Sequence, residues 1–321
     1  MVAFFYSSIY TIFMNITTLK SDSLLLLTAA IWGFAFVAQR VGMDYVGPFT
    51  FNGVRFALGS LVLVPLILRN KKNQTPNGKV LKREEKKVVI FGGAILGITL
   101  FAAASLQQVG LVYTTAGNAG FITGLYVVLV PILGLFWKQR PDAGTWIGAF
   151  FAVIGLYFLS ITDKFTISFG DLLELFGAFL WAGHVLIIGW LSPKMDSLKL
   201  ACTQFAACSV LSLTTALLFE KIVMKSIFQA AIPILYGGAL SVGVAYTLQV
   251  VAQKKAHPAH AAILLSLEAV FAAFGGWLIL DETLTSRGII GCALMLTGML
   301  LSQLWGLYGD GRRSLINQEL K

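Results

Sequence analysis

Charged residues are scarce in this chain of 321 residues, of which only 12% are Asp, Glu, Lys or Arg and 57% are hydrophobic. A soluble domain usually has roughly 25% charged residues. This shortage excludes an ordinary water-soluble protein. Because one membrane span needs only about 20 apolar residues, the apolar residues must be distributed over many spans. In a membrane protein, the distribution of the basic residues behind the formal net charge of +9 indicates which side of the membrane each loop faces. We therefore predict no nucleic-acid partner from this charge.

Sequence motifs for ATP-driven or cofactor-dependent chemistry are also lacking. The chain has no GxxxxGK[ST] sequence, so we do not expect it to use ATP directly. Its three cysteines form no CxxC pair. His257 and His260 have the spacing of metal ligands on a helix, but no third ligand lies near them in the sequence. Since a nucleophile with a matching base is missing too, we predict no enzyme, no cofactor and no metal site.

Long stretches without charge mark the candidate membrane spans, because a charge at the bilayer centre costs roughly 2.5 to 3.5 kcal/mol. Two further apolar stretches each enclose one charge, Arg55 in 48–68 and Glu268 in 259–280. The pattern predicts an all-α integral membrane protein with ten transmembrane helices. We place these helices at residues 23–43, 48–68, 88–110, 114–137, 145–161, 171–191, 200–219, 229–253, 259–280 and 287–306.

The basic residues indicate how the chain crosses the membrane. Most of the 24 Lys and Arg residues fall on one side of the predicted bundle, above all in the connection 69–87. The positive-inside rule then predicts that both termini and this connection are cytoplasmic, with the basic stretch near anionic lipid headgroups. We interpret residues 1–22 as an interfacial or disordered N-terminal extension, with a membrane role as the alternative. We predict that residues 307–321 form a cytoplasmic tail.

The second half of the chain repeats the first. Residues 55–60 (RFALGS) align with 204–209 (QFAACS), and the same offset of 149 places Trp32 on Trp181. The repeats are predicted at 23–162 and 163–306. Because each has five helices, an odd number, the second repeat enters the membrane from the opposite side. Inverted repeats of this kind are typical of secondary transporters, which alternate access around a site at the bilayer midplane.

Several short segments also carry a family resemblance. They are IWGFAF (31–36), FNGVRF (51–56), TAGNAGFITG (115–124), LSLEAVF (265–271) and DETL (281–284). In this order and spacing the chain resembles the EamA family of the drug/metabolite transporter superfamily over most of its length. The resemblance implies a central cavity lined mainly by helices 1, 3, 4, 6, 8 and 9, with helices 5 and 10 at the periphery.

This resemblance also implies a function. We expect a secondary active transporter in the cytoplasmic (inner) membrane of a bacterium. It would export amino acids or related small metabolites, with protons as a candidate coupling ion, and a homodimer is left open. The alternatives are a non-transporting membrane scaffold or regulatory subunit, and a membrane-embedded enzyme. A scaffold would not require charged residues such as Arg55 and Glu268 inside the bilayer.

Those two charged residues are the first candidates for a functional site. Glu268 lies near the middle of its span, where an ionisable group is costly and marks a functional site by default. Its carboxyl group could contact substrate or exchange protons, or it could be a structural charge between helices. Arg55 lies near the centre of its span, and its guanidinium stays charged. It would bind an anionic substrate group or hold helix 2 to a neighbour.

Uncharged candidates lie on the other predicted helices. Trp32 and Trp181 occupy matching places deep in helices 1 and 6, where they would pack in the core or form a stacking surface in the cavity. His184 lies one turn past Trp181, either as a packing residue or in the site. We interpret Asp281 and Glu282 as a solvated turn. The remaining candidates suit a cavity wall or interhelical hydrogen bonding: Gln107, Gln249, Asn118 and Tyr126.

Overall fold

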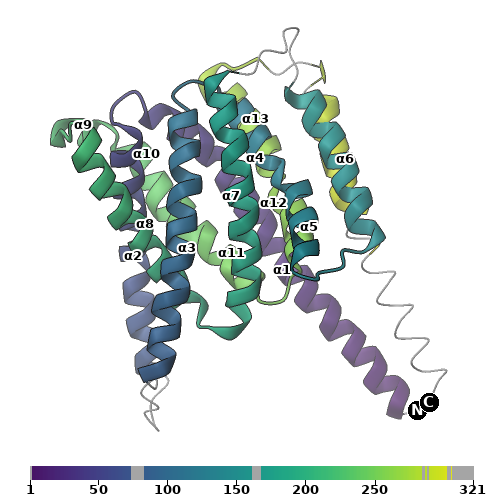
Figure 1. The fold of residues 1–321 in the computed structure, drawn as a ribbon. Coiled ribbons are helices and arrows are strands. Elements are labelled where there is room, and N and C mark those ends of the chain that lie inside the picture. The colour runs from purple at the N-terminus through teal and green to yellow at the C-terminus, as the bar shows by residue number, and fades with distance from the viewer. Residues whose placement is uncertain are drawn as a thin grey trace.

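All the described elements of the chain are helical. The structure is a computed structural model and describes residues 2–73, 83–160, 168–283, 286–287, 289–301 and 305. The helices lie side by side in a bundle, from which α1 projects (Figure 1). In chain order they are α1 (Val2–Gly42), α2 (Pro48–Asn73), α3 (Arg83–Gly110), α4 (Ala116–Gly124), α5 (Tyr126–Phe136), α6 (Ala143–Ser160), α7 (Phe169–Leu191), the 3-10 helix η1 (Ser192–Lys194), α8 (Ser197–Phe219), α9 (Met224–Gln229), α10 (Ala231–Leu235), the π-helical segment η2 (Tyr236–Tyr246), α11 (Thr247–Ala252), α12 (Pro258–Leu265) and α13 (Glu268–Leu280).

The helices confirm the predicted all-α membrane fold. Among the described residues, eight helices are long and apolar enough to cross a membrane, and two shorter apolar helices occupy Ala143–Gly155 and Ile289–Leu301. The predicted helix 287–306 lies partly outside the described residues. The eight longer spans are Thr18–Gly42, Pro48–Arg69, Val89–Gly110, Ala116–Phe136, Phe169–Lys194, Ser197–Phe219, Ala231–Ala252 and Pro258–Leu280.

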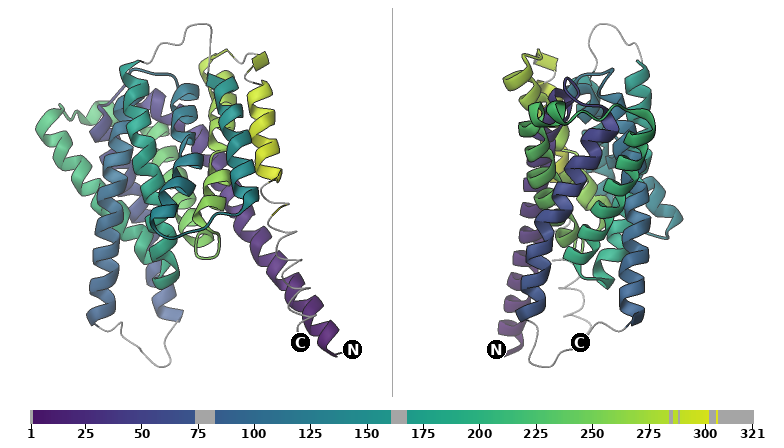
Figure 2. Two further views of the ribbon diagram at one scale, coloured as in Figure 1. Left: turned by 45° about the vertical axis from the view of Figure 1, so that its right-hand side comes forward. Right: turned by 90° about the vertical axis from the view of Figure 1, so that its left-hand side faces the viewer.

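The first helix is longer than its predicted span. It begins at Val2 rather than near residue 23, so residues 2–22 are helical and continuous with the predicted first span. This part of the sequence has no glycine or proline to end a helix, and it therefore continues the span in one direction. The early turns of α1 extend beyond the rest of the bundle (Figures 1 and 2).

The two ends of the bundle can be named by residues that lie there. At the Gly42 end, α1, α3 and α13 finish while α2, α4 and α7 begin. At the Asn73 end, α2, α5 and α11 finish while α3, α8 and α12 begin. Figure 2 shows the end of α2 and the start of α3 at the same end of the bundle as the start of α1. The basic connection 69–87 is therefore attached to the bundle at the Asn73 end.

Packing joins the two halves of the chain. Helix α2 runs along α8, α3 packs on α7 and α8, and α1 packs on α13. Helix α6 and the helix at 289–301 lie at one edge of the bundle (Figure 1). They approach closely because a Cβ atom at Gly298 would lie 2.7 Å from the Gly148 carbonyl oxygen. The structure thus places the helices predicted as the fifth and tenth at the periphery.

Two spans that the sequence predicted as continuous are interrupted. The fourth divides into α4 and α5 at Leu125, whose amide donates to the Ile122 carbonyl in a tighter i to i−3 turn. The ninth divides into α12 and α13 in the same manner, where the Leu267 amide donates to Leu264. A functional candidate follows each break directly. Tyr126 begins α5, and Glu268 begins α13.

The eighth span is also irregular. Between α10 and α11 the backbone winds as a π-helix over Tyr236–Tyr246, where 229–253 was predicted as one regular helix. The segment contains three glycines, which lower helix stability and allow α2 to approach closely. A Cβ at Gly238 would lie 2.9 Å from the Arg55 carbonyl oxygen. Widened helical turns of this kind are frequent at functional sites.

Candidate substrate cavity

A cavity lies where the two halves of the chain meet. The space between its lining atoms is about 450 Å³, which includes open solvent at its mouth. Helices from both halves line it, and the interrupted spans contribute side chains next to their breaks. The lining residues are Trp32, Ala35, Phe36, Gln39, Arg55, Gln107, Thr123, Tyr126, Trp181, Val185, Ser241, Tyr246, Gln249 and Glu268.

Most of the residues nominated from the sequence meet in this cavity, and two do not. His184 is fully buried behind the wall, where its Nε2 lies 3.0 Å from Gln204 Oε1. Asn118 lies in the first turn of α4, and its main-chain amide donates to Thr115 Oγ1. The nominated residues that line the cavity are Trp32, Arg55, Gln107, Tyr126, Trp181, Gln249 and Glu268.

Arg55 supplies positive charge to the cavity wall. Only 3% of the residue is exposed, and its guanidinium lies 5.5 Å from the Phe51 ring centre and 5.0 Å from that of Phe56. These cation–π contacts stabilise the charge without neutralising it. Arg55 Nε has no hydrogen-bond partner in the described structure, and the described ion pairs do not include Arg55. The guanidinium is therefore available to an anionic group in the cavity.

Glu268 supplies a carboxyl group on the opposite repeat. It lies in the first turn of α13, where the helix dipole favours negative charge. The Tyr126 side chain lies beside this carboxyl group, although neither its hydroxyl oxygen nor Glu268 Oε1 meets the geometry of a hydrogen bond with a described residue. Gly33 lets α1 pack on this break, because a Cβ there would lie 2.7 Å from the Glu268 carbonyl oxygen. Glu268 and Tyr126 both line the cavity, so a ligand there can approach the carboxyl and the hydroxyl together.

Aromatic rings form the wall between these charges. The ring centres of Trp32 and Tyr246 lie 4.4 Å apart, and Trp181 stacks on Tyr246 at 6.1 Å. Trp32 Nε1 donates to the main-chain carbonyl of Ser241 in η2 at 3.3 Å. Sequence reasoning missed Tyr246 because its orientation depends on the π-helical turns. A signal in the sequence was its position immediately before the TLQ segment at 247–249, which aligns with the SLQ segment at 105–107.

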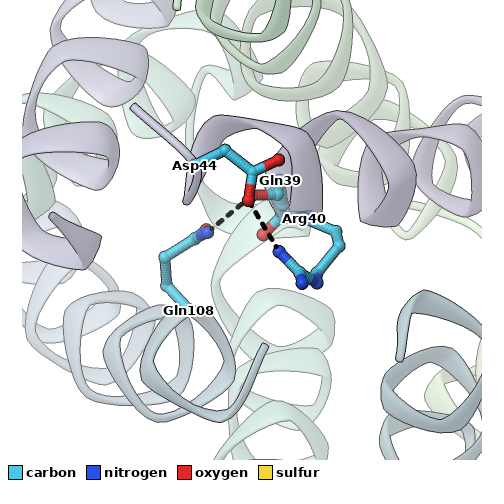
Figure 3. A network of polar contacts seen from close by, with 4 residues as sticks. All are labelled: Gln39, Arg40, Asp44 and Gln108. Carbon is cyan, nitrogen blue, oxygen red and sulfur yellow. Dashed lines mark hydrogen bonds and ion pairs between the residues drawn. The ribbon is translucent and has the colours of Figure 1, made fainter. Parts of the chain in front are cut away.

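Glutamines connect α1 to α3 on the Gly42 side of the cavity. Gln107 Nε2 donates to Gln39 Oε1 at 3.4 Å, and Gln108 Nε2 donates to the Gln39 main-chain carbonyl at 3.3 Å. Arg40 and Asp44 form an ion pair next to this contact at 3.2 Å (Figure 3). Neutral amides hold the helices together here without the desolvation cost of a charge.

Sequence reasoning missed another buried charge, Glu174 in α7. We counted only Arg55 and Glu268 inside spans, but Glu174 is 0% exposed. Thr123 Oγ1, which lines the cavity, donates to Glu174 Oε2 at 3.2 Å. The signal was present, since Glu174 falls within the predicted helix 171–191. Because Glu174 is near the start of that helix, the sequence suggested that it lies at the membrane surface. In the structure it is instead enclosed by α3, α4 and α7.

The cavity has polar atoms without hydrogen-bond partners among the described residues, which is typical of a site that binds a ligand. Across the described residues, no group of three or more His, Cys, Asp or Glu could hold a metal ion. Several cavity atoms instead have no hydrogen-bond partner, although buried polar groups normally have one. They are Arg55 Nε, Tyr126 Oη, Trp181 Nε1, Gln249 Oε1 and Glu268 Oε1.

Comparison with known sequences identifies the family. The EamA-like transporter family matches residues 19–161 and, a second time, residues 168–304. The chain belongs to the EamA-like transporter family. It is thus a membrane transporter built from two EamA halves, consistent with inverted repeats, and its family is not one of enzymes. The cavity agrees with the EamA resemblance in the helices that line it, except that α2 also contributes, through Arg55.

Individual EamA relatives cover most of the chain. An uncharacterized transporter from Archaeoglobus fulgidus is 33% identical over 291 residues, which cover 90% of this chain and 88% of the relative. The uncharacterized transporter YoaV of Bacillus subtilis is 23% identical and covers 85% of this chain and 92% of its own length. A protein of known crystal structure shares the fold with a TM-score of 0.71 at 18% identity, over 89% of this chain and 97% of the other.

Proposed function

We propose that this EamA transporter exports small amphoteric metabolites, such as amino acids, by alternating access around the central cavity. One observation carries the proposal. The cavity holds the guanidinium of Arg55 and the carboxyl of Glu268, and among the described residues these groups form no ion pair with each other. A ligand with both an anionic and a cationic group would satisfy both at once, with its carboxylate at Arg55 and its ammonium at Glu268.

The remaining lining supports the same ligand class. Trp32, Trp181 and Tyr246 offer ring faces to an apolar or aromatic side chain of the ligand. Gln107 and Gln249 offer amides for further hydrogen bonds. All these residues come from one chain, so the proposal does not require a second copy.

The interrupted helices support alternating access. Tyr126 and Glu268 each follow a break, and such breaks mark the midplane site of many secondary transporters. We propose that the repeats 23–162 and 163–306 tilt about these breaks. We further propose that both termini are cytoplasmic in a bacterial inner membrane, because the basic connection 69–87 adjoins the Asn73 end. Export is our proposed direction, which rests on the family resemblance.

Counterflow in liposomes tests the proposed substrate. The purified protein is reconstituted into liposomes loaded with unlabelled amino acids, and the entry of a mixture of ¹⁴C-labelled amino acids is followed. We expect labelled uptake that Arg55→Gln and Glu268→Gln each lower by about tenfold or more, which corresponds to roughly 1.4 kcal/mol of lost binding. Arg40→Gln is the matched control, because Arg40 pairs on the surface with Asp44. Unchanged uptake in both cavity variants, or no uptake by the wild type, would contradict the proposal.

A further inference from the structure

Glu174 is the buried charge that substrate binding leaves unexplained. It is fully buried, and it does not line the cavity itself. Its Oε2 accepts the hydrogen bond from Thr123, while its Oε1 has no partner in the described structure. An unpaired carboxylate inside a membrane protein is costly, and such residues mark ion or proton pathways. A proton is the ligand that removes this cost, because it neutralises the group and adds a donor.

The surroundings of Glu174 bring acids and no cation. Asp171 lies one turn earlier on α7, and Glu268 lines the same cavity as Thr123, the hydrogen-bond partner of Glu174. The part of α3 at 88–110 and all of α4 have no titratable residue, while α5 brings only Tyr126. Tyr113 lies near the start of α7, against Gly170.

Cations on or next to α7 are too distant to reach Glu174. His184 is ten residues further along the helix, about 15 Å at 1.5 Å per residue, and it is hydrogen-bonded to Gln204. On α12, His260 pairs with Asp22 towards the Asn73 end. Lys194 in η1 lies beyond the far end of α7. A metal ion or a salt bridge therefore does not explain the carboxyl among the described residues.

The position of Glu174 connects the bundle surface to the cavity. Asp171 is partly exposed at the Gly42 end, where it accepts a hydrogen bond from Thr114 Oγ1 at 2.7 Å. Thr123 bonds to Glu174 and also faces the cavity that Glu268 lines. Gly110 makes room for the carboxyl, because a Cβ there would lie 2.7 Å from Glu174 Oε1. Glu174 thus lies between Asp171, which caps the start of α7 at the Gly42 end, and Thr123, which lines the cavity.

We propose that Glu174 is a proton-binding site that passes the coupled proton between the Gly42 end of the bundle and Glu268. In each transfer an O–H bond breaks on one carboxylic acid and forms on the next carboxylate. The hydroxyl of Thr123 can accept from the cavity side while it donates to Glu174. This inference rests on the proposed transport function, to which it adds the coupling ion and its route. Glu268 alone would couple protons only through the open cavity.

Two transport assays separate coupling from binding. Liposomes containing the protein are tested for counterflow of ¹⁴C-labelled amino acids and for accumulation of the same mixture driven by a pH gradient. We expect Glu174→Gln to keep counterflow within about twofold and to lower gradient-driven accumulation by about tenfold or more, since only the second assay moves net protons. Thr123→Val, which removes the hydroxyl group that donates to Glu174, should lower gradient-driven accumulation, and Thr123→Ser should restore it. Asp196→Asn, a helix cap at the other end, is the matched control.

A measurement without substrate keeps the two proposals distinguishable. Infrared difference spectra of the protein in lipid, recorded during an acid titration, report the carbonyl stretch of protonated carboxylic acids. We expect a band that Glu174→Gln removes and Asp196→Asn keeps, whether or not amino acids are transported. Its presence in Glu174→Gln, or accumulation equal to the wild type in that variant, would overturn the proton site. If the wild type transports no amino acid but the band behaves as expected, only the proposed substrate is wrong.

Discussion

The carboxylate of Glu220, which follows α8, accepts hydrogen bonds from Thr50 at the start of α2. The main-chain amide of Thr50 donates at 2.8 Å and its hydroxyl at 2.6 Å, while the Phe49 amide donates to the other oxygen. Glu282, which follows α13, accepts from the amide of Ala116 at the start of α4 in the same way. Each carboxylate thus caps a helix of the other repeat, and both caps lie at the Gly42 end.

The opposite end is capped differently. At the Asn73 end, Asp196 caps its own helix α8, and His257 caps its own helix α12. Opening the Gly42 end between the repeats would therefore separate two charged caps, whereas the helix starts at the Asn73 end keep theirs. This corrects the interpretation of Glu282 as part of a solvated turn. The sequence shows an acid after a helix, but not the helix start that it contacts.

Removal of both caps is expected to favour a state open at the Gly42 end. In a protein with Cys202, Cys208 and Cys292 replaced by alanine, the thiol labelling rate of a Gln39→Cys variant reports access from that end. Because one cap contributes about 0.5–2 kcal/mol, we expect the paired variant Glu220→Ala with Glu282→Ala to label at least about fivefold faster. Asp196→Ala serves as the control. Equal labelling rates in all three proteins would show that the caps do not hold this end closed.

The contact of α1 with α13 is expected to tolerate no added side-chain atom. A Cβ at Gly33 would collide with Phe271 and lie 2.7 Å from the Glu268 carbonyl oxygen, whereas Gly183 has nothing within 4 Å. Overpacking typically costs about 1–3 kcal/mol. We expect Gly33→Ala to lower the melting temperature of the protein in detergent and to impair transport. Gly183→Ala, the matched change on an open helix face, should leave both unchanged or raise stability slightly.

Acid is expected to weaken the start of α12 through His257. Its Nδ1 accepts from the Ala259 amide at 3.3 Å, which requires a neutral ring. Burial lowers the pKa of His257 despite the nearby Asp142. Because the pKa is lower in the folded protein, this cap stabilises above the unfolded pKa of about 6.5 and loses its contribution as pH falls below it. We expect a fall in melting temperature between about pH 7.5 and 5.5 that is smaller in His257→Asn, which caps without titrating. Identical pH profiles would contradict this role.

Aromatic substrates are expected to depend on Trp32 more than small ones do. Trp32→Phe keeps a ring beside Tyr246 but removes the bond from Nε1 to Ser241, and Trp32→Ala removes both. In counterflow, we expect Trp32→Ala to raise the KM for phenylalanine about tenfold and that for alanine by less, since a stacked ring pair contributes about 0.5–1.5 kcal/mol beyond buried area. Trp32→Phe should be intermediate. Equal changes for both substrates would mean that the ring only supports the fold.

The sequence predicted the spans well because hydropathy and charge act locally. The hydropathy of one segment identifies it as a membrane span without knowledge of the other segments. The odd number of helices in each repeat then predicts that the second repeat has the opposite orientation in the membrane. Arg55 and Glu268 were found because a charge stands out in an apolar run. His184 was predicted either to pack or to lie in the site, and Asn118 to suit a cavity wall or an interhelical hydrogen bond. The structure places both outside the cavity, since residue type does not say which face of a helix a side chain occupies.

The sequence by itself determined that the chain is an integral membrane protein, where its spans lie and that they form an inverted repeat, because hydropathy and the absence of charge identify the segments that lie in the bilayer. Tertiary structure alone decided which polar groups meet. Glu174 is enclosed because α3 and α4 cover its helix, and Tyr246 reaches the cavity because η2 winds as a π-helix. Glu220 finds its partner 170 residues away at Thr50. Such contacts join segments distant in sequence, so they depend on helix packing rather than on any local pattern.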